Sequence, residues 1–356
     1  MDTKILEFPP VKRKTGGKHS YLYEEIDFFE NLNIKRAVKS LKEGSVVAIP
    51  TETVYGLAAD AFQPEAVKKI FQVKNRPQDN PLIVHISSFE MLETLIAKPL
   101  LEKDRNILEH FWPGPLTVLF EKSQNVDDIV TCGQSRVAVR MPSHPIARSL
   151  ISQLGSPLAA PSANLSGRPS PTTAAHVLKD LNGRIEYILD GGSCLSGLES
   201  TVLDIDSETI LRPGGITLED LKEVLPNVKV YVKGTDENME NRPATPGMKY
   251  RHYAPNAKVL IFENKRDLIE HAVTLKNEDG GVRIGLMYSD EDLLAKRELW
   301  HEIHYLGKTV DDVAFNLFDG LRSLDSFESD VILVVKVPAI GTGLAVMNRL
   351  EKAASS

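Results

Sequence analysis

The sequence predicts an α/β protein with two domains, and three observations support this prediction. The chain has 356 residues, which is longer than most single domains, and 42% of them are hydrophobic, enough for buried cores. Short apolar runs typical of buried strands alternate with segments of helical periodicity along most of the chain. Residues 233–246 are polar and lack apolar periodicity, so they mark a linker between two such series.

The composition limits the classes of function. The 49 acidic residues outnumber the 42 Lys and Arg residues and leave a net charge of −7, which argues against a large nonspecific nucleic-acid surface but not against a local basic cleft. Cys132 and Cys194 form no CxxC pair, which fits a reducing compartment and argues against a structural zinc. No signal peptide or long apolar run is visible, so we expect a cytoplasmic protein without membrane contact.

The N-terminal third begins with an arm and continues into a helix and a strand. Proline and glycine pairs interrupt residues 1–28, so we expect an arm with little structure of its own. Residues 31–42 have helical apolar spacing, and residues 46–50, VVAIP, read as a buried strand. The polar run TETVY at 51–55 follows directly. It could present polar groups at a sheet edge, and a strand-to-helix turn with threonine as a cap explains it equally well.

Residues 74–85, KNRPQDNPLIVH, place two cations on a stiff connection between a predicted helix at 65–73 and a predicted strand at 81–86. Pro77 and Pro81 prevent the helix from continuing. Lys74 and Arg76 are therefore held between two packed elements, where they could bind an anion. For this stretch alone, solvated cations at a helix C-terminus are the simpler interpretation.

Two further segments have polar residues where a ligand could bind. Arg140 interrupts the predicted strand 137–141, and a buried arginine needs a partner, either an anionic ligand or an internal carboxylate. Ser162 and Asn164 lie in the loop 157–171, PLAAPSANLSGRPSP, which its prolines keep out of regular structure. Such loops often bind ligands, although many are plain connections. Glycines beside Arg212 would allow a backbone to approach a phosphate closely.

The C-terminal part begins with GMKYRHYAP at 247–255, where Tyr250, Tyr253 and neighbouring cations could cover an anionic, aromatic ligand or simply anchor a domain. Predicted strands at 258–263, 282–288, 302–307 and 330–337 then alternate with helical patterns, the longest at 310–324. This order is typical of a parallel sheet. The chain contains no P-loop, kinase signature, GxSxG elbow or HExxH pair, so any nucleotide is bound by an uncommon architecture.

Together these motifs resemble the YrdC-like threonylcarbamoyl-AMP synthases in their long, two-domain form. The resemblance runs from about residue 31 to the end and rests on PTETVYGLA at 50–58, the K-x-R of Lys74 and Arg76, the S-x-N of Ser162 and Asn164, ESTV at 199, LRPGGI at 211 and GMKYRHYAP at 247. It implies a twisted mixed-sheet α/β catalytic domain at 29–235, a linker or lid at 236–255 and a smaller Rossmann-like parallel α/β domain at 256–356, after the arm at 1–28.

The resemblance also implies an activity. Members of this family are nucleotidyltransferases that make L-threonylcarbamoyl-adenylate from L-threonine, bicarbonate and ATP and release pyrophosphate. The product serves the threonylcarbamoyladenosine modification of tRNA next to the anticodon, so a transferase that receives the adenylate is the implied protein partner, and any tRNA contact is secondary. Mg²⁺ would arrive with the ATP phosphates. The chemistry requires no covalent enzyme nucleophile, only positioning and charge stabilisation.

The site residues that the resemblance implies fall into three groups. The catalytic group is Lys74, Arg76, Ser162 and Asn164. The ATP-binding group is Arg76, Asn80, Arg136, Ser162, Ser170, Arg212, Tyr250 and Tyr253. The L-threonine-binding group is Thr51, Thr53, Tyr55, His85, Arg140, Ala160 and Ser200, and no residue is expected to bind a metal directly. Arg136 stands where the family would have a small hydroxyl residue, so its contact with nucleotide would be through the backbone or of another kind.

Two alternatives are less favoured. A carbamoyl-AMP-forming relative of the hydrogenase-maturation type would carry zinc-finger cysteines and an acylphosphatase-like module, and the sequence shows neither. An RNA-binding module without chemistry is disfavoured by the net charge of −7 and by the lack of an aromatic RNA platform.

Overall fold

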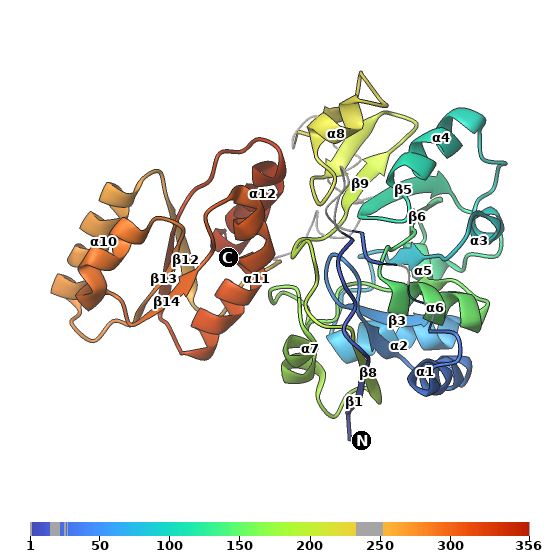
Figure 1. Ribbon diagram of the computed structural model, residues 1–356, viewed down its shortest axis with the longest axis horizontal. Coiled ribbons are helices and arrows are strands. Elements are labelled where there is room, and N and C mark those ends of the chain that lie inside the picture. Colours follow the sequence, from blue (N-terminus) through green and yellow to red (C-terminus); the bar gives the residue numbers. More distant parts are fainter. Residues whose placement is uncertain (1, 15–21, 25, 27, 233–251, 356) are drawn as a thin grey trace. The chain divides into compact units, whose positions relative to one another are not determined.

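The computed structural model describes residues 2–14, 22–24, 26, 28–232 and 252–355. The chain divides into two compact units (Figure 1). The first comprises Met1–Ser166 and Pro171–Lys249, and the second comprises Gly167–Ser170 and Tyr250–Ser356. The two-domain α/β prediction is confirmed. The predicted boundaries at 28, 235 and 255 stay predictions, and most of the predicted linker lies outside the described residues.

The first unit is built on one mixed sheet. Its 11 strands lie in the order β1-β8-β2-β3-β7-β4-β6-β5-β9-β10-β11. The strands are β1 (Lys4–Glu7), β2 (Val47–Ile49), β3 (Gly56–Asp60), β4 (Ile83–His85), β5 (Leu116–Glu121), β6 (Arg136–Arg140), β7 (Leu158–Ala159), β8 (Tyr187–Asp190), β9 (Thr201–Asp204), β10 (Thr209–Arg212) and β11 (Lys229–Val230). β4 and β6 run parallel, whereas β5 and β6 run antiparallel, so the mixed sheet that the resemblance implied is present.

Helices cover both faces of this sheet, because side chains in each strand alternate between two cores. In β2, Val47 and Ile49 belong to the apolar cluster around α1 and α6, and Ala48 belongs to the larger cluster around α2. Asn31 caps α1 by accepting hydrogen bonds from two backbone N–H groups, and Pro64 opens α2. The helices are α1 (Leu32–Lys42), α2 (Pro64–Lys74), α3 (Phe89–Leu95), α4 (Glu102–Phe111), α5 (Asp128–Thr131), α6 (Pro145–Leu154), α7 (Ala174–Leu181) and α8 (Leu218–Lys222).

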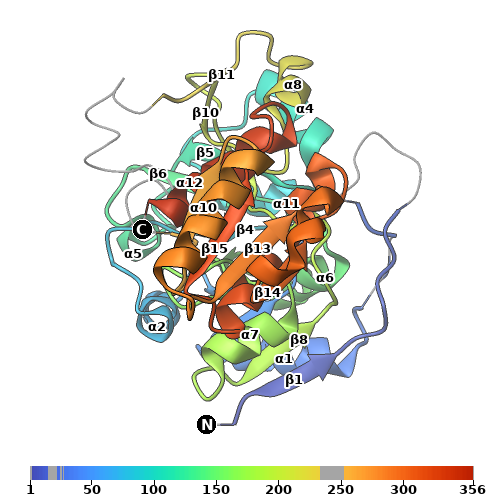
Figure 2. The same ribbon diagram turned by 90° about the vertical axis from the view of Figure 1, so that its left-hand side faces the viewer.

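The N-terminal arm has more structure than the sequence predicted. β1 pairs in parallel with β8, from Lys4 opposite Tyr187 to Glu7 opposite Asp190. The two strands lie side by side in both views (Figures 1 and 2). Leu6 is buried in the cluster around α1 and α6. The expectation of an arm with little structure of its own is therefore wrong for these residues, because β8 offers an open sheet edge beside an apolar surface.

The second unit is a smaller parallel α/β layer structure, as predicted. Its four strands lie in the order β12-β15-β13-β14, and every neighbouring pair is parallel. They are β12 (Lys258–Phe262), β13 (Ile284–Tyr288), β14 (Glu302–Tyr305) and β15 (Val331–Val335). The sheet lies between α10 with the 3-10 helix η1 on one face and α11 with α12 on the other (Figure 1). These helices are α10 (Lys265–Glu278), η1 (Glu291–Leu299), α11 (Val310–Ser326) and α12 (Thr342–Ala354).

Four residues of the predicted ligand loop belong to this second unit. The backbone N–H of Ala254 donates to the carbonyl oxygen of Gly167 at 2.9 Å. The guanidinium of Arg322, in α11, donates to the carbonyl oxygen of Pro169 from Nε at 3.1 Å and from Nη2 at 2.5 Å. Gly167–Ser170 are thus held by the residues of the second unit although they interrupt the first unit in sequence. Among the helices that the structure describes, none is both long and apolar enough to span a membrane.

Candidate functional site

The predicted site residues come together at the ends of neighbouring strands in the first unit. In the β4–β6 ladder His85 lies opposite Arg140, and in the β5–β6 ladder Thr117 lies opposite Arg140. β9 then pairs with β5 on one side and with β10 on the other, where Arg212 lies opposite Val202. The strand order and register therefore place His85, Arg140 and Arg212, which are far apart in sequence, on nearby strands of one sheet.

Arg140 is the centre of a buried polar cluster. Its Nη1 donates to Thr53 Oγ1 at 2.8 Å, and its Nε donates to the carbonyl oxygen of Gly114 at 3.2 Å. Its Nη2 lies 2.6 Å from Glu52 Oε1, and the side chains of Arg140 and Glu52 are only 4% and 0% exposed. The structure thus shows the internal carboxylate that the sequence left as one of two options. Nη2 carries two N–H groups and the pair with Glu52 uses one of them, so the other could donate to a ligand oxygen.

Glu52 is the residue that sequence reasoning missed. Its Oε2 accepts a hydrogen bond from the backbone N–H of Ser143 at 3.1 Å, so both carboxylate oxygens face groups at the end of β6. Removing the Glu52 charge would leave a buried guanidinium without its counter-charge. A signal was present, because the sequence places this carboxylate between Thr51 and Thr53 directly after a buried strand.

The threonines of this turn organise its backbone. Thr51 Oγ1 accepts hydrogen bonds from the N–H groups of Thr53 and Val54, both at 3.2 Å, and donates to the carbonyl oxygen of Val54 at 2.6 Å. This arrangement fixes the direction of Thr53 toward Arg140. The Tyr55 hydroxyl donates instead to the carbonyl oxygen of Gly192 at 2.7 Å. Its predicted place near threonine stays a prediction.

The K-x-R and S-x-N motifs meet, as the resemblance implied. The ammonium of Lys74, which is 1% exposed, donates to the carbonyl oxygens of Ser162 and Asn164. The Ser162 hydroxyl in turn donates to Asn164 Oδ1 at 2.6 Å. Ser162 also forms an isolated bridge with Gly56, at the start of β3. Lys74 therefore holds the backbone of the loop whose side chains are predicted to bind nucleotide.

Arg76 and Asn80 are placed on the turn that follows α2. The guanidinium of Arg76 donates to the carbonyl oxygens of Asn80, at 3.1 Å from Nε, and of Pro81, at 2.9 Å from Nη2. These bonds keep a half-buried cation at the turn between α2 and β4. Asn80 is 3% exposed, and its Oδ1 has no hydrogen-bond partner. A buried oxygen of this kind is a candidate contact for a ligand donor.

Ser200 and Arg212 form a second buried cluster next to the first. Ser200 Oγ shares a hydrogen bond of 2.7 Å with Thr117 Oγ1 and accepts one from Arg212 Nη2 at 3.2 Å. Arg212 also donates to the carbonyl oxygen of Ser200 from Nε at 3.2 Å and from Nη2 at 2.9 Å. A Cβ on Gly214 would lie 2.3 Å from the carbonyl oxygen of Glu199, so this glycine permits close approach to neighbouring backbone.

His85 contributes a neutral imidazole. Burial, with a smaller contribution from the positive charge of Arg140, lowers the pKa of His85 from 6.5 to about 3. Its Nδ1 has no hydrogen-bond partner. Because its pKa is so low, the imidazole of His85 can donate or accept a hydrogen bond at neutral pH but adds no positive charge.

The predicted threonine contact Ala160 lies directly after β7, where its N–H donates to the carbonyl oxygen of Ile83 at 2.9 Å.

Of the remaining predicted nucleotide residues, one lies apart from these clusters, two belong to the second unit and one lies outside the described residues. Arg136 lies at the other end of β6, about 13 Å along the strand from Arg140, and forms a bidentate pair with Asp204 at 2.8 and 2.7 Å. Ser170 and Tyr253 belong to the second unit, where the Tyr253 ring lies 5.3 Å from that of Phe318. Tyr250 lies outside the described residues. The roles of all four in ATP binding stay predictions.

Comparison with known proteins adds independent information. A family model for Sua5, YciO and YrdC proteins, described as telomere recombination, matches residues 39–214. A model described as the C-terminal domain of threonylcarbamoyl-AMP synthase matches residues 216–355. Together they span almost the whole of both units.

Similar proteins are also found at full length. The threonylcarbamoyl-AMP synthase of Pyrococcus abyssi is 46% identical over 332 residues, which cover 91% of this chain and 94% of that protein. The one from Bacillus subtilis is 45% identical over 324 residues, which cover 90% and 92%. The crystal structure of P. abyssi Sua5 in complex with L-threonine matches with a TM-score of 0.85 and 43% identity, and the match covers 99% of this chain and 98% of that one.

Proposed function

Since the chain belongs to the threonylcarbamoyl-AMP synthase family, we propose that it makes L-threonylcarbamoyl-adenylate from L-threonine, bicarbonate and ATP. The reaction class is nucleotidyl transfer. Threonine and bicarbonate combine to a carbamate with loss of water, and a carbamate oxygen then attacks the α-phosphorus of ATP while pyrophosphate leaves. The product supplies a transferase that modifies tRNA next to the anticodon. We also propose a cytoplasmic location, which the free Cys132 and Cys194 support.

The observation that carries this proposal is the buried donor set around Arg140. The Nη2 of Arg140 pairs with Glu52 through one of its two N–H groups, and the neutral His85 lies opposite Arg140 in the sheet. A guanidinium with a remaining donor fits the carboxylate of an amino acid. The relative from P. abyssi was crystallised with L-threonine, which supports the same ligand here. Arg140, His85 and the hydroxyls of Thr53 and Ser200 would hold and orient threonine.

The second part of the site would bind the triphosphate. Lys74 anchors the loop of Ser162 and Asn164, and Arg76 and Arg212 add fixed positive charge. Because the attacking group belongs to the substrate, these residues act by positioning ATP and by stabilising charge on the phosphates as pyrophosphate leaves. Mg²⁺ bound to ATP would neutralise further charge. The buried Asn80 Oδ1, which has no hydrogen-bond partner, is an oxygen that fits a hard cation or its water.

Pyrophosphate release from ATP tests the proposal. L-threonine and bicarbonate are supplied together or singly, with L-serine and carbamoyl phosphate as controls. Release that requires both threonine and bicarbonate is the expected result. Release only with carbamoyl phosphate would move the protein to the hydrogenase-maturation type of chemistry. The absence of release under every condition would favour a binding module, which a salt titration of tRNA binding would then examine.

A further inference from the structure

The S-x-N loop has a buried acidic neighbour that the predicted site does not include. Asp180 lies in the last turn of α7 and is 5% exposed. Its Oδ2 accepts a hydrogen bond at 3.2 Å from the backbone N–H of Leu165, the residue directly after Asn164. A carboxylate at a helix C-terminus opposes the helix dipole, and its burial costs desolvation free energy. Helix structure alone therefore disfavours this carboxylate, and its contact with the loop is the feature that accounts for it.

One peptide unit of this loop is held from both sides by opposite charges. The carbonyl oxygen of Asn164 accepts a hydrogen bond from the ammonium of Lys74, and the N–H of Leu165 donates to Asp180. The two backbone groups belong to the same peptide unit, because the C=O of one residue and the N–H of the next share a plane, and in a trans peptide they point in opposite directions. Lys74 and Asp180 therefore fix this plane with a charge-assisted hydrogen bond on each side.

The orientation of the Asn164 side chain depends on this plane. Its Nδ2 donates to the carbonyl oxygen of Leu165 at 2.8 Å, and its Oδ1 accepts from the Ser162 hydroxyl at 2.6 Å. The next N–H along the chain, that of Ser166, donates to the carbonyl oxygen of Lys74 at 3.0 Å. Rotation of the Asn164–Leu165 plane would disturb all three contacts, because each of them lies within two residues of it.

The two charges reach the loop from different helices. Lys74 is the last residue of α2, whereas Asp180 lies in α7. The guanidinium of Arg184, shortly after α7, donates to the carbonyl oxygen of Val73 at 3.2 Å, so the C-terminal ends of the two helices are also linked directly. The packing of α7 beside the end of α2 thus brings a cation and an anion to the same segment of backbone.

We propose that Asp180 is a positioning residue of the ATP site, which acts together with Lys74 by fixing the Asn164–Leu165 peptide plane and so orients the side chains of Ser162 and Asn164 toward the phosphates. This inference rests on the proposed function, since it takes the S-x-N loop as part of the ATP site. In this role Asp180 touches no substrate. Its loss should weaken the binding of ATP and leave the binding of threonine, which is assigned to other residues, unchanged.

Two measurements on the full chain test the proposal. Calorimetric titration with ATP and Mg²⁺, without threonine, gives the Kd for ATP, and initial rates of pyrophosphate release give the KM for ATP and for L-threonine. Asp180→Ala should raise the Kd and the KM for ATP about tenfold, the loss expected for a charge-assisted hydrogen bond, with an unchanged KM for L-threonine. Asp180→Asn keeps an oxygen acceptor without the charge and should lie between wild type and Asp180→Ala, so the test remains decisive if the alanine variant folds poorly.

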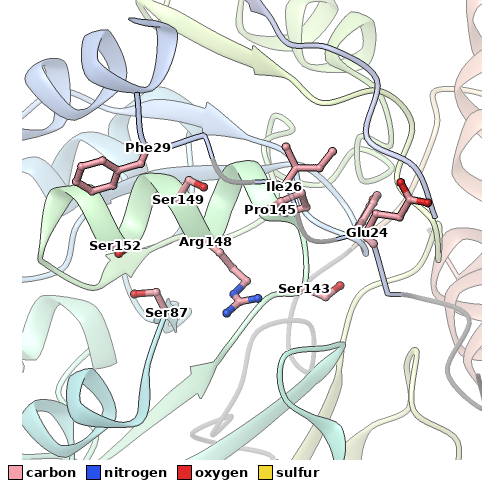
Figure 3. Close-up of a pocket in the computed structure, with 10 residues that line it drawn as sticks. Glu24, Ile26, Phe29, Ser87, Ser143, Pro145, Arg148, Ser149 and Ser152 are labelled. Atoms are coloured by element: carbon pink, nitrogen blue, oxygen red, sulfur yellow. The ribbon is translucent and has the colours of Figure 1, made fainter. Parts of the chain in front are cut away.

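Two control variants separate positioning from a general loss of stability. Asp60→Asn removes the charge of another buried carboxylate, 7% exposed, at the opposite end of β3 from the bridge to Ser162. Arg148→Ala removes a charge from the wall of a separate cavity, which Ser87 and Ser143 also line (Figure 3). Both variants should leave the Kd and the KM for ATP unchanged, even where the free energy of unfolding falls.

The possible outcomes distinguish this inference from the proposed function. Pyrophosphate release by the wild type that does not require threonine and bicarbonate would refute the proposed function, while the titration with ATP would still test Asp180. Wild-type affinity for ATP in Asp180→Ala, an equal rise in the KM for ATP and for L-threonine, or the same loss of ATP affinity in Asp60→Asn would overturn the inference. A wild-type chain that does not bind ATP would overturn both.

Discussion

The two units differ in how deeply they bury the charged side chains near the ends of their sheets. In the first unit Glu52, Lys74, Arg140 and Arg212 are 0%, 1%, 4% and 5% exposed and lie at or just beyond strand and helix ends. In the second unit the ion pairs at the sheet ends are exposed, as in Lys265 with Asp290, whose side chains are 45% and 48% exposed. Burying a charged side chain costs several kcal/mol of desolvation free energy, so such a side chain is expected only where the fold or the chemistry requires it. The contrast supports the prediction that the chemistry takes place in the first unit.

The second unit has an informative exception. Arg322 is 7% exposed and Arg349 is 0% exposed. Arg322 holds the carbonyl oxygen of Pro169, and the guanidinium of Arg349 lies 5.5 Å from the ring centre of Tyr253. The buried arginines of this unit are thus next to the two segments, 167–170 and 252–255, that the sequence associated with nucleotide binding. Buried arginines thus lie beside these two segments, whereas the ion pairs at the ends of the described parallel sheet are exposed.

The largest effect is expected from a buried cation of the first unit. Lys74→Ala should lower pyrophosphate release by roughly two to three orders of magnitude, because it removes a positive charge and frees the carbonyl oxygens of Ser162 and Asn164. Lys68→Ala is the matched control, since Lys68 lies on the same helix with a 49% exposed side chain. Wild-type turnover in Lys74→Ala with intact folding would show that the site is misassigned.

The second-largest effect is expected from a substitution of the buried carboxylate of Glu52. Glu52→Gln should reduce the free energy of unfolding by about 3–5 kcal/mol, because it leaves the guanidinium of Arg140 buried without its counter-charge. In the folded fraction, the KM for L-threonine should rise more than kcat falls, because Glu52 orients Arg140 and does not touch the reacting atoms. Denaturant unfolding and initial rates measure the two effects. An unchanged free energy of unfolding would mean that the pair contributes nothing to the fold.

The buried histidines should give a smaller, pH-dependent effect. Burial lowers the pKa of His85 and of His144 from 6.5 to about 3. Between these values the unfolded chain binds more protons than the folded chain, so the free energy of unfolding falls as the pH drops from about 6.5 toward 3. Above pH 6.5 these groups contribute no slope. Unfolding measured against pH should show a shallower fall for His85→Gln than for wild type, and identical slopes would refute the assignment.

The smallest effect is expected on the surface of the second unit. Lys265 pairs with Asp290 and Asp292, but solvent surrounds all three side chains. Lys265→Ala should leave pyrophosphate release unchanged and shift the unfolding midpoint only slightly, with the shift vanishing in high salt. A large loss of stability would erase the contrast between the two sheets.

Local patterns in the sequence were sufficient for most elements. α1 is visible from apolar spacing and from Asn31 as its cap, and β13 and β15 are visible as apolar runs bounded by polar turns. β1 was missed because only one residue of its four, Leu6, is buried, so the segment shows no apolar pattern. The side chain of Asp290 caps η1 by accepting a hydrogen bond from the backbone N–H of Asp292.

The site was only partly predictable for a different reason. The K-x-R and S-x-N motifs could be paired through the family resemblance, and the structure confirms that Lys74 contacts the loop of Ser162 and Asn164. Glu52 as the partner of Arg140 depends on strand register, which no local pattern reveals. The assignment of residues 167–170 to the second unit likewise depends on a long-range contact with Arg322.

Mass spectrometry of the adenylate product tests the central claim most directly. The full chain is incubated with ATP, Mg²⁺, L-threonine and either ordinary or isotopically labelled bicarbonate, and Arg140→Gln serves as the comparison. The account predicts an adenylate that contains threonine and one carbon from bicarbonate, so its mass shifts with the label, and a strongly reduced yield from Arg140→Gln at limiting threonine. An adenylate without threonine, a product that does not take up the label, or a yield independent of Arg140 would contradict it.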